Sequence, residues 1–170
     1  MFPLEDLNFE KRLDELQKLC QDRALTIATA ESCTGGLIGA LLSHQSGSSG
    51  HYLGSIVAYA NAVKTKVLKV PSELIDKHGA VSQEVAESMA MQVRHLMGSD
   101  FSLAVTGIAG PSGGTPDKPV GTVWCAWANA EGVQSQKFHF PGDRETVRAL
   151  TAWHSLDGLW SLLQVHLPTP

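Results

Sequence analysis

Apolar residues recur along the chain at two spacings, and these predict helices and strands in alternation. In residues 4–20, leucines repeat every three or four positions among charged residues, which is typical of an amphipathic helix. The short, partly β-branched run 25–30 predicts a buried strand, and the apolar residues of 37–42 predict a second helix. Turn residues at 47–50 end that helix.

The middle of the chain continues this alternation, with capping residues at the expected places. Residues 55–59 predict a second strand, and Asn61 is expected to cap the short helix that follows. Pro71 opens another short helix, and Gly79 closes it. Ser82 is a suitable N-cap for a longer amphipathic helix.

The last third predicts three further strands and a final helix. Residues 101–105 form the third strand, and a loop rich in glycine and proline follows it. Strands at 122–128 and 133–140, joined by a turn at Glu131-Gly132, predict a hairpin. The final helix begins at 141–143. Together these elements predict a three-layer α/β/α domain with a mixed sheet of about five strands.

Composition indicates an ordinary soluble protein. The 170 residues are 43% hydrophobic, which is enough for one packed core, and the formal net charge is −4. Because the 13 Lys and Arg residues form no block, we expect no nucleic-acid partner. Three cysteines fit neither a disulfide framework nor a zinc site. With neither a signal peptide nor an apolar run of about 20 residues, we expect a cytoplasmic chain without a membrane partner.

Two predicted strands end in glycine-bearing turns that also carry hydroxyl groups. The first turn contains Thr34, Gly35 and Gly36, and the second contains Thr106 and Gly107. Ligands gather at the carboxyl ends of strands in such sheets, and the amides that open a helix attract anions. Neither turn matches a known nucleotide-binding signature, so a tight strand-to-helix turn explains each equally well.

A lysine after the second strand is the other candidate for chemistry. Lys64 is either a solvated surface residue or, if buried, a base of lowered pKa that activates a serine. Ser32, Ser48 and Ser49 are the candidate serines, although each is also suited to a turn. Cys33, at a possible helix start, keeps a thiol nucleophile open.

Two further observations concern charged and metal-binding side chains. The seven histidines show no metal-ligand spacing, and we expect no metal. Glu31, at a strand end beside the first glycine turn, is expected to hold a loop or face a cation.

Six segments in order resemble the CinA C-terminal domain family, the nicotinamide-nucleotide amidases, from about residue 25 to residue 160. They are AESCTGG (30–36), GSS (47–49), YANAVK (59–64), GAVS (79–82), TGIAGP (106–111) and KPVGTV (118–123). The resemblance implies hydrolysis of nicotinamide mononucleotide to nicotinic acid mononucleotide and ammonia, in pyridine-nucleotide salvage. It also implies one α/β/α domain over residues 1–170, without the molybdopterin-binding-like domain of longer members, and a homodimer that needs no cofactor.

The family's site maps onto catalytic and substrate-binding positions of this chain. Ser49 is favoured as the nucleophile with Lys64 as its base, Ser32 is its rival, and Tyr59 is a further catalytic candidate. The expected substrate-binding residues are Thr34, Gly35, Gly36, Ser48, Asn61, Thr106, Gly107 and Arg144, the last as a phosphate ligand. Two alternatives remain open: an inactive homologue that only binds pyridine nucleotides, and a hydrolase that uses the Cys33 thiol.

Overall fold

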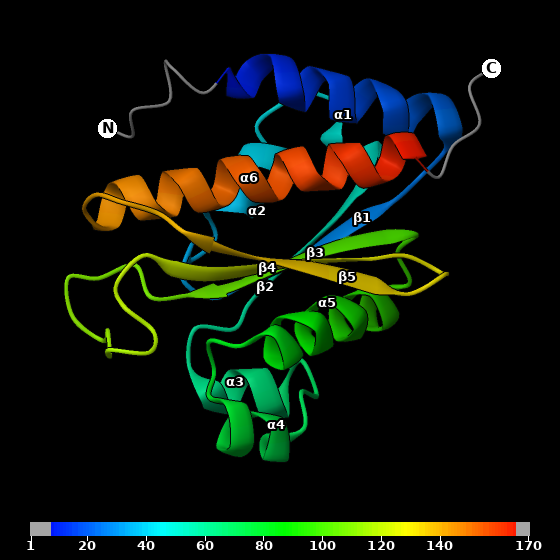
Figure 1. Ribbon diagram of the computed structural model, residues 1–170. Coiled ribbons are helices and arrows are strands. Elements are labelled where there is room, and N and C mark those ends of the chain that lie inside the picture. The colour runs from blue at the N-terminus through cyan, green and yellow to red at the C-terminus, as the bar shows by residue number, and fades with distance from the viewer. Residues whose placement is uncertain (1–7, 166–170) are drawn as a thin grey trace.

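A five-stranded mixed sheet forms the middle layer of the protein, and the computed structural model describes residues 8–165 (Figure 1). The strand order is β2-β1-β3-β4-β5. β1 pairs in parallel with β2 and β3, whereas β4 is antiparallel to both β3 and β5. The strands are β1 (Ile27–Glu31), β2 (Tyr52–Val57), β3 (Phe101–Gly107), β4 (Thr122–Ala128) and β5 (Val133–His139). The predicted fold class is confirmed.

Helices cover both faces of the sheet. Figure 1 shows α1, α2 and α6 on one face and α3, α4 and α5 on the other. The helices are α1 (Phe9–Arg23), α2 (Leu37–Leu42), α3 (Asn61–Lys66), α4 (Ser72–His78), α5 (Gln83–Met97) and α6 (Arg144–Val165), with a 3₁₀ turn at Ser48–Gly50. None of the helices in residues 8–165 is both long and apolar enough to cross a bilayer.

Successive residues of β1 point to opposite faces of the sheet and build two cores. Ile27 packs in the core beneath α1 and α6, whereas Ala28 and Ala30 pack in the core beneath α5. All five residues of β1 are buried, because this strand is internal to the sheet and helices cover it on both sides. Because β1 and β3 are parallel neighbours, their carboxyl ends lie side by side, between the two helical layers.

Most predicted elements agree with the structure, and the differences lie at their ends. α1 begins at Phe9, whereas the predicted helix begins at residue 4. Its first leucines, at positions 4 and 7, lie outside the described residues. The second strand is Tyr52–Val57 rather than 55–59, because Tyr52 already pairs with Ile27. Asn61 is the first residue of α3 and not its cap; the N-cap is Ala60, which makes no side-chain bond.

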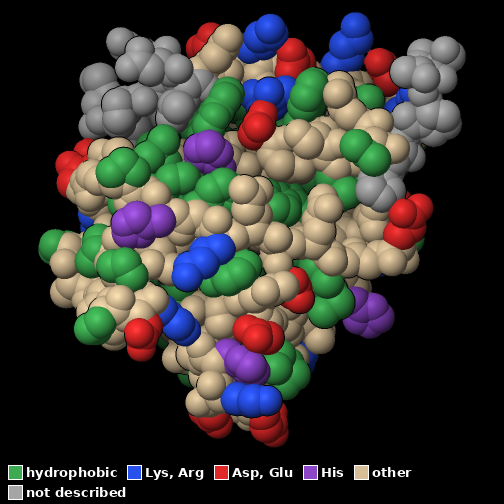
Figure 2. Space-filling view, viewed as in Figure 1, with side chains coloured by type: hydrophobic (Ala, Val, Ile, Leu, Met, Phe, Trp, Pro, Cys, Tyr) green, Lys and Arg blue, Asp and Glu red, His purple; other side chains and the backbone are tan. Residues whose placement is uncertain are grey.

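Other predicted boundaries are confirmed. Pro71 and Gly79 flank α4, and the Ser82 hydroxyl accepts a hydrogen bond from the Val85 amide at the start of α5. The hairpin turn closes with the Asn129 amide donating to the Gly132 carbonyl. On the face seen in Figure 2, basic and acidic side chains are interspersed across the described surface.

Candidate active site

Ser32 and Lys64 meet at the carboxyl end of β1. Ser32 directly follows the strand, and its amide donates to the Val105 carbonyl of β3. Lys64 lies on α3, and its Nζ is 3.0 Å from Ser32 Oγ. Ser32 is 8% exposed and Lys64 is 1% exposed. The structure thus assembles the serine–lysine arrangement from two segments that lie 32 positions apart.

Burial changes the acid–base properties of the Lys64 amine. Besides Ser32, Nζ donates to the carbonyl oxygens of Ala58 at 2.8 Å and Tyr59 at 3.3 Å. Desolvation lowers the pKa of Lys64 from its usual 10.5, because the charged form is disfavoured away from water. A lowered pKa makes Lys64 better suited to act as a base than a solvated lysine.

The pair opens into a cavity of about 340 Å³, within the range of small-molecule sites. Of the expected residues, Ser32, Tyr59, Asn61, Lys64, Thr106, Gly107 and Arg144 all line it. The Thr106 hydroxyl donates to the Ala80 carbonyl at 2.8 Å, which ties β3 to the segment before α5. Seven expected site residues from four parts of the chain therefore share one cavity.

Arg144 reaches the cavity from the first turn of α6. One guanidinium nitrogen donates to the Gly110 carbonyl at 3.0 Å, and another donates to the Tyr59 hydroxyl at 2.8 Å. The Tyr59 side chain is 57% exposed, so its ring lies at the mouth of the cavity. Arg144 thereby places a fixed positive charge beside this aromatic ring.

The first glycine turn does not present its amides to the cavity, which corrects the prediction for Thr34, Gly35 and Gly36. The Thr34 hydroxyl and the Gly36 amide both donate to the carboxylate of Glu31, at 2.6 and 3.0 Å. The Gly35 amide donates to the Ser32 carbonyl. These three residues are absent from the cavity lining, because the chain's own carboxylate occupies the anion site that they form.

Ser48 and Ser49, of which Ser49 was the favoured nucleophile, lie away from Lys64. They belong to the 3₁₀ turn that precedes β2, at the amino end of that strand. Because β2 runs parallel to β1, the turn before β2 and Ser32 after β1 lie at opposite ends of these two strands. Neither serine lines the cavity, and Ser32 is the serine in contact with Lys64.

Cys33 lines the cavity, but its environment is unsuited to a thiolate. Burial raises the pKa of the Cys33 thiol to about 12, and the nearby Glu31 carboxylate acts in the same direction. Nucleophilic attack requires the thiolate, which burial disfavours, so this environment favours Ser32 over the Cys33 thiol as the nucleophile.

Several cavity residues were not singled out from the sequence. They are Ala80, Val81, Ile108, Ala109, Gly110, Ser112 and Gly113. Ala80 and Val81 lie within the GAVS segment, and 108–110 lie within TGIAGP. These segments contributed to the family resemblance, but their side chains carry no group that indicates a role in a site. Among residues 8–165, no group of three His, Cys, Asp or Glu side chains is arranged to hold a metal ion.

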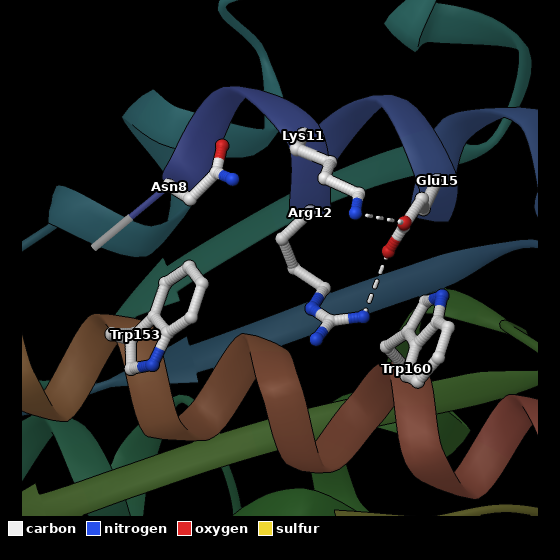
Figure 3. A pocket seen from close by; sticks show the side chains of 6 residues that line it. All are labelled: Asn8, Lys11, Arg12, Glu15, Trp153 and Trp160. Carbon is white, nitrogen blue, oxygen red and sulfur yellow. Dashed lines mark hydrogen bonds and ion pairs between the residues drawn. The ribbon is translucent and has the colours of Figure 1, made fainter. Parts of the chain in front are cut away.

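A second cavity, of about 360 Å³, lies between α1 and α6 (Figure 3). The Arg12 guanidinium there is paired with Glu15 at 2.8 Å and Asp157 at 2.6 Å, and it stacks on Trp160 at 4.0 Å. These contacts fasten the two helices to each other. These contacts already engage the Arg12 guanidinium. The cavity lined by Ser32 and Lys64 is therefore the candidate active site.

Known proteins resemble the chain over almost its whole length. The model of the CinA C-terminal domain matches residues 10–163. A CinA-like protein of Citrifermentans bemidjiense is 48% identical over 161 residues, covering 95% of this chain and 39% of that protein. A CinA-like protein of Desulfotalea psychrophila is 53% identical over 79% of this chain and 33% of its own length. The chain thus spans well under half the length of these curated relatives.

Solved structures give the same result. The competence damage-inducible protein A of Klebsiella pneumoniae has a TM-score of 0.91 at 34% identity, covering 94% of this chain and 99% of that one. The competence/damage inducible protein CihA of Agrobacterium tumefaciens has a TM-score of 0.90 at 35% identity, covering 95% and 98%. Sequence and fold agree, and the chain belongs to the CinA C-terminal domain family.

Proposed function

We propose that this chain hydrolyses the carboxamide of nicotinamide mononucleotide, with Ser32 as the nucleophile and Lys64 as its base. The observation that carries the proposal is the buried contact of 3.0 Å between Lys64 Nζ and Ser32 Oγ, at the floor of a cavity of small-molecule size. A nucleophile in contact with a base of lowered pKa is the arrangement that acyl transfer requires.

The surroundings of the Lys64 amine favour its role as a base. A neutral amine has two N–H groups and one lone pair. The carbonyl oxygens of Ala58 and Tyr59 accept the two N–H groups, which leaves the lone pair directed at Ser32 Oγ. When the amine is protonated, the third N–H donates to Ser32 instead. The same geometry therefore supports both protonation states that the reaction needs.

The reaction proceeds through an ester of Ser32. Lys64 takes the hydroxyl proton as Oγ attacks the amide carbon, and a tetrahedral intermediate forms. Its C–N bond then breaks, Lys64 returns the proton to the leaving nitrogen, and ammonia departs. Water attacks the ester carbonyl with Lys64 again accepting a proton. The C–Oγ bond breaks and releases nicotinic acid mononucleotide, and the proton returns to Ser32.

The backbone amide next to Ser32 is suited to stabilise the oxyanion. Cys33 lines the cavity, and within the described part of the chain its N–H group makes no hydrogen bond to another residue. Cys33 directly follows the nucleophile, which is where acyl-transfer enzymes commonly place one such donor. A single donor of this kind contributes about 3 kcal/mol to transition-state stabilisation.

The mouth of the cavity suits the two charges of the substrate. The Arg144 guanidinium is the cavity's candidate ligand for the phosphate. The exposed ring of Tyr59 offers its face to the cationic pyridinium. These assignments place the nucleotide across the opening, with the carboxamide toward Ser32.

Ammonia release from nicotinamide mononucleotide by the full chain tests the proposal. We expect Ser32→Ala and Lys64→Ala each to lower kcat by at least about 1,000-fold, because each removes one half of the serine–lysine pair. Ser49→Ala is the matched control and should keep the wild-type rate, since Ser49 lies at the opposite end of the strands from Ser32.

Two outcomes would contradict the proposal. Loss of activity in Ser49→Ala with full activity in Ser32→Ala would reverse the choice of nucleophile. Calorimetric binding of the mononucleotide by the wild type without release of ammonia would make the chain a nucleotide-binding module.

A further inference from the structure

Glu31 is a buried carboxylate that forms no ion pair within the described residues. It is the last residue of β1 and is 0% exposed. Its oxygens accept hydrogen bonds from the Thr34 hydroxyl (2.6 Å), the amides of Gly36 (3.0 Å), Ile38 (3.1 Å) and Gly39 (2.8 Å), and the Ser55 hydroxyl (3.2 Å). An unpaired buried charge is costly unless such bonds replace its hydration.

These bonds hold the turn that carries the proposed nucleophile. Glu31 and Ser32 are adjacent, and side chains alternate at the end of a strand, so the two point to opposite faces of the sheet. Glu31 binds the start of α2 on one face, while Ser32 meets Lys64 of α3 on the other. The hydrogen bonds of Glu31 therefore fix the chain on both sides of Ser32, at the end of β1 and at the start of α2.

Close packing of α2 against the strands makes this attachment possible. Gly39 lies so near β2 that a Cβ there would be 2.9 Å from Tyr52 Oη and 3.2 Å from Ser55 Cβ. A side chain at this position would push α2 outward. The Gly39 amide would then leave the Glu31 carboxylate, to which it now donates at 2.8 Å.

We propose that Glu31 is a positioning residue for the serine nucleophile, an inference that rests on the proposed function. Its carboxylate fixes the α2 turn so that Ser32 Oγ stays within reach of Lys64. It also occupies the amides of Gly36, Ile38 and Gly39, which leaves that of Cys33, a residue of the cavity lining, for the reacting oxygen. Glu31 itself touches no reacting atom.

Glu31→Gln tests the role, because its amide group would place N–H donors against the backbone amides of α2. We expect kcat for nicotinamide mononucleotide to fall by about 100-fold with KM unchanged, since a small displacement of a reacting atom has an effect of this size. We also expect labelling of Ser32 by diisopropyl fluorophosphate, in which Oγ displaces fluoride, to slow in parallel. This second measurement does not depend on the identity of the substrate.

Two further variants separate positioning from loss of stability. Ser102→Ala removes a buried hydrogen bond to the Ala90 carbonyl at the far end of β3. It should lower Tm while leaving kcat and the labelling rate unchanged. Gly39→Ala leaves the Glu31 carboxylate intact but displaces α2, so it should slow labelling even if Glu31→Gln does not fold.

The outcomes distinguish this inference from the proposed function. A lower Tm with unchanged kcat and labelling in the folded Glu31 or Gly39 variant would overturn the positioning role. Labelling that slows in the variants of a chain that does not hydrolyse the mononucleotide would keep the positioning role and overturn the substrate. A wild-type Ser32 that is never labelled would overturn both.

Discussion

The amine of Lys64 has exchanged water for three protein oxygens, those of Ser32, Ala58 and Tyr59. At 1% exposure it is among the largest fully buried side chains of the protein. The unfolded chain hydrates this group fully, so the two states bind protons with different affinities. The stability of the fold is therefore linked to the protonation of Lys64, the group that we propose as the catalytic base.

Comparison of the wild type with Lys64→Met should reveal this linkage. Because the folded pKa of Lys64 lies below the unfolded value of 10.5, the folded chain binds fewer protons between the two values. The free energy of unfolding of the wild type, relative to the variant, should therefore rise with pH across this window. The limiting slope is about 1.4 kcal/mol per pH unit.

Urea denaturation at several pH values measures this difference, and subtraction of the variant removes the contribution of the buried thiols. A difference that stays constant up to the ordinary lysine pKa would mean that Lys64 is fully hydrated.

The sequence predicted the residue types of the site better than their pairing. The pattern predicts Lys64 just after a strand, and both Ser32 and Ser49 lie within segments that resemble those of the family. The choice between the two serines depends on which end of a strand each turn occupies, because Ser32 follows the carboxyl end of β1, where it meets Lys64, whereas Ser49 precedes the amino end of β2. The sequence predicted that Glu31 holds a loop or faces a cation, but not which groups bind it, since the backbone amides that donate to it carry no side-chain signal.

At the scale of elements, α6 is joined to the sheet through Trp127 of β4. The indole N–H donates to the Ser155 carbonyl at 2.7 Å, and the ring lies against Gly158. A Cβ at Gly158 would overlap the indole ring, so the absence of a side chain allows the helix to lie this close. This contact could not be predicted from the sequence, because a glycine within a helix indicates only a lower helix propensity.

Gly158→Ala should lower the free energy of unfolding by about 1–3 kcal/mol, although alanine favours helices, because overpacking outweighs helix propensity. Gly50→Ala is the matched control, since a Cβ at Gly50 meets nothing within 4 Å. Urea denaturation of both variants is the measurement. Equal stability of the two would show that Trp127 can move aside without cost.

At the scale of the whole molecule, the candidate site joins parts of the chain that are far apart. Ser32 follows β1, Lys64 lies on α3, Thr106 lies near the end of β3 and Arg144 is the first residue of α6. The alternation of helices and strands predicted this layered fold, since periodicity reports which face of each element is buried. It could not predict that Arg144 and Tyr59, 85 positions apart, are joined by a hydrogen bond across the cavity mouth.

Arg144→Ala should distinguish substrates by their phosphate. We expect KM for nicotinamide mononucleotide to rise by about 10- to 100-fold, the usual loss for a hydrogen bond between charged groups. KM for nicotinamide riboside, which has no phosphate, should change little. Ammonia release with each substrate measures the difference, and Arg144→Lys should recover part of it. An equal loss for both substrates would assign Arg144 to holding Tyr59 instead.

The strand order also has a consequence for synthesis of the chain. β1 lies between β2 and β3, but β3 begins at Phe101, long after β1 and β2 have left the ribosome. Throughout that interval a nascent chain exposes one unpaired, apolar edge of β1, which is open to pairing with other chains. β1, the strand that directly precedes Ser32, thus completes its pairing late in synthesis.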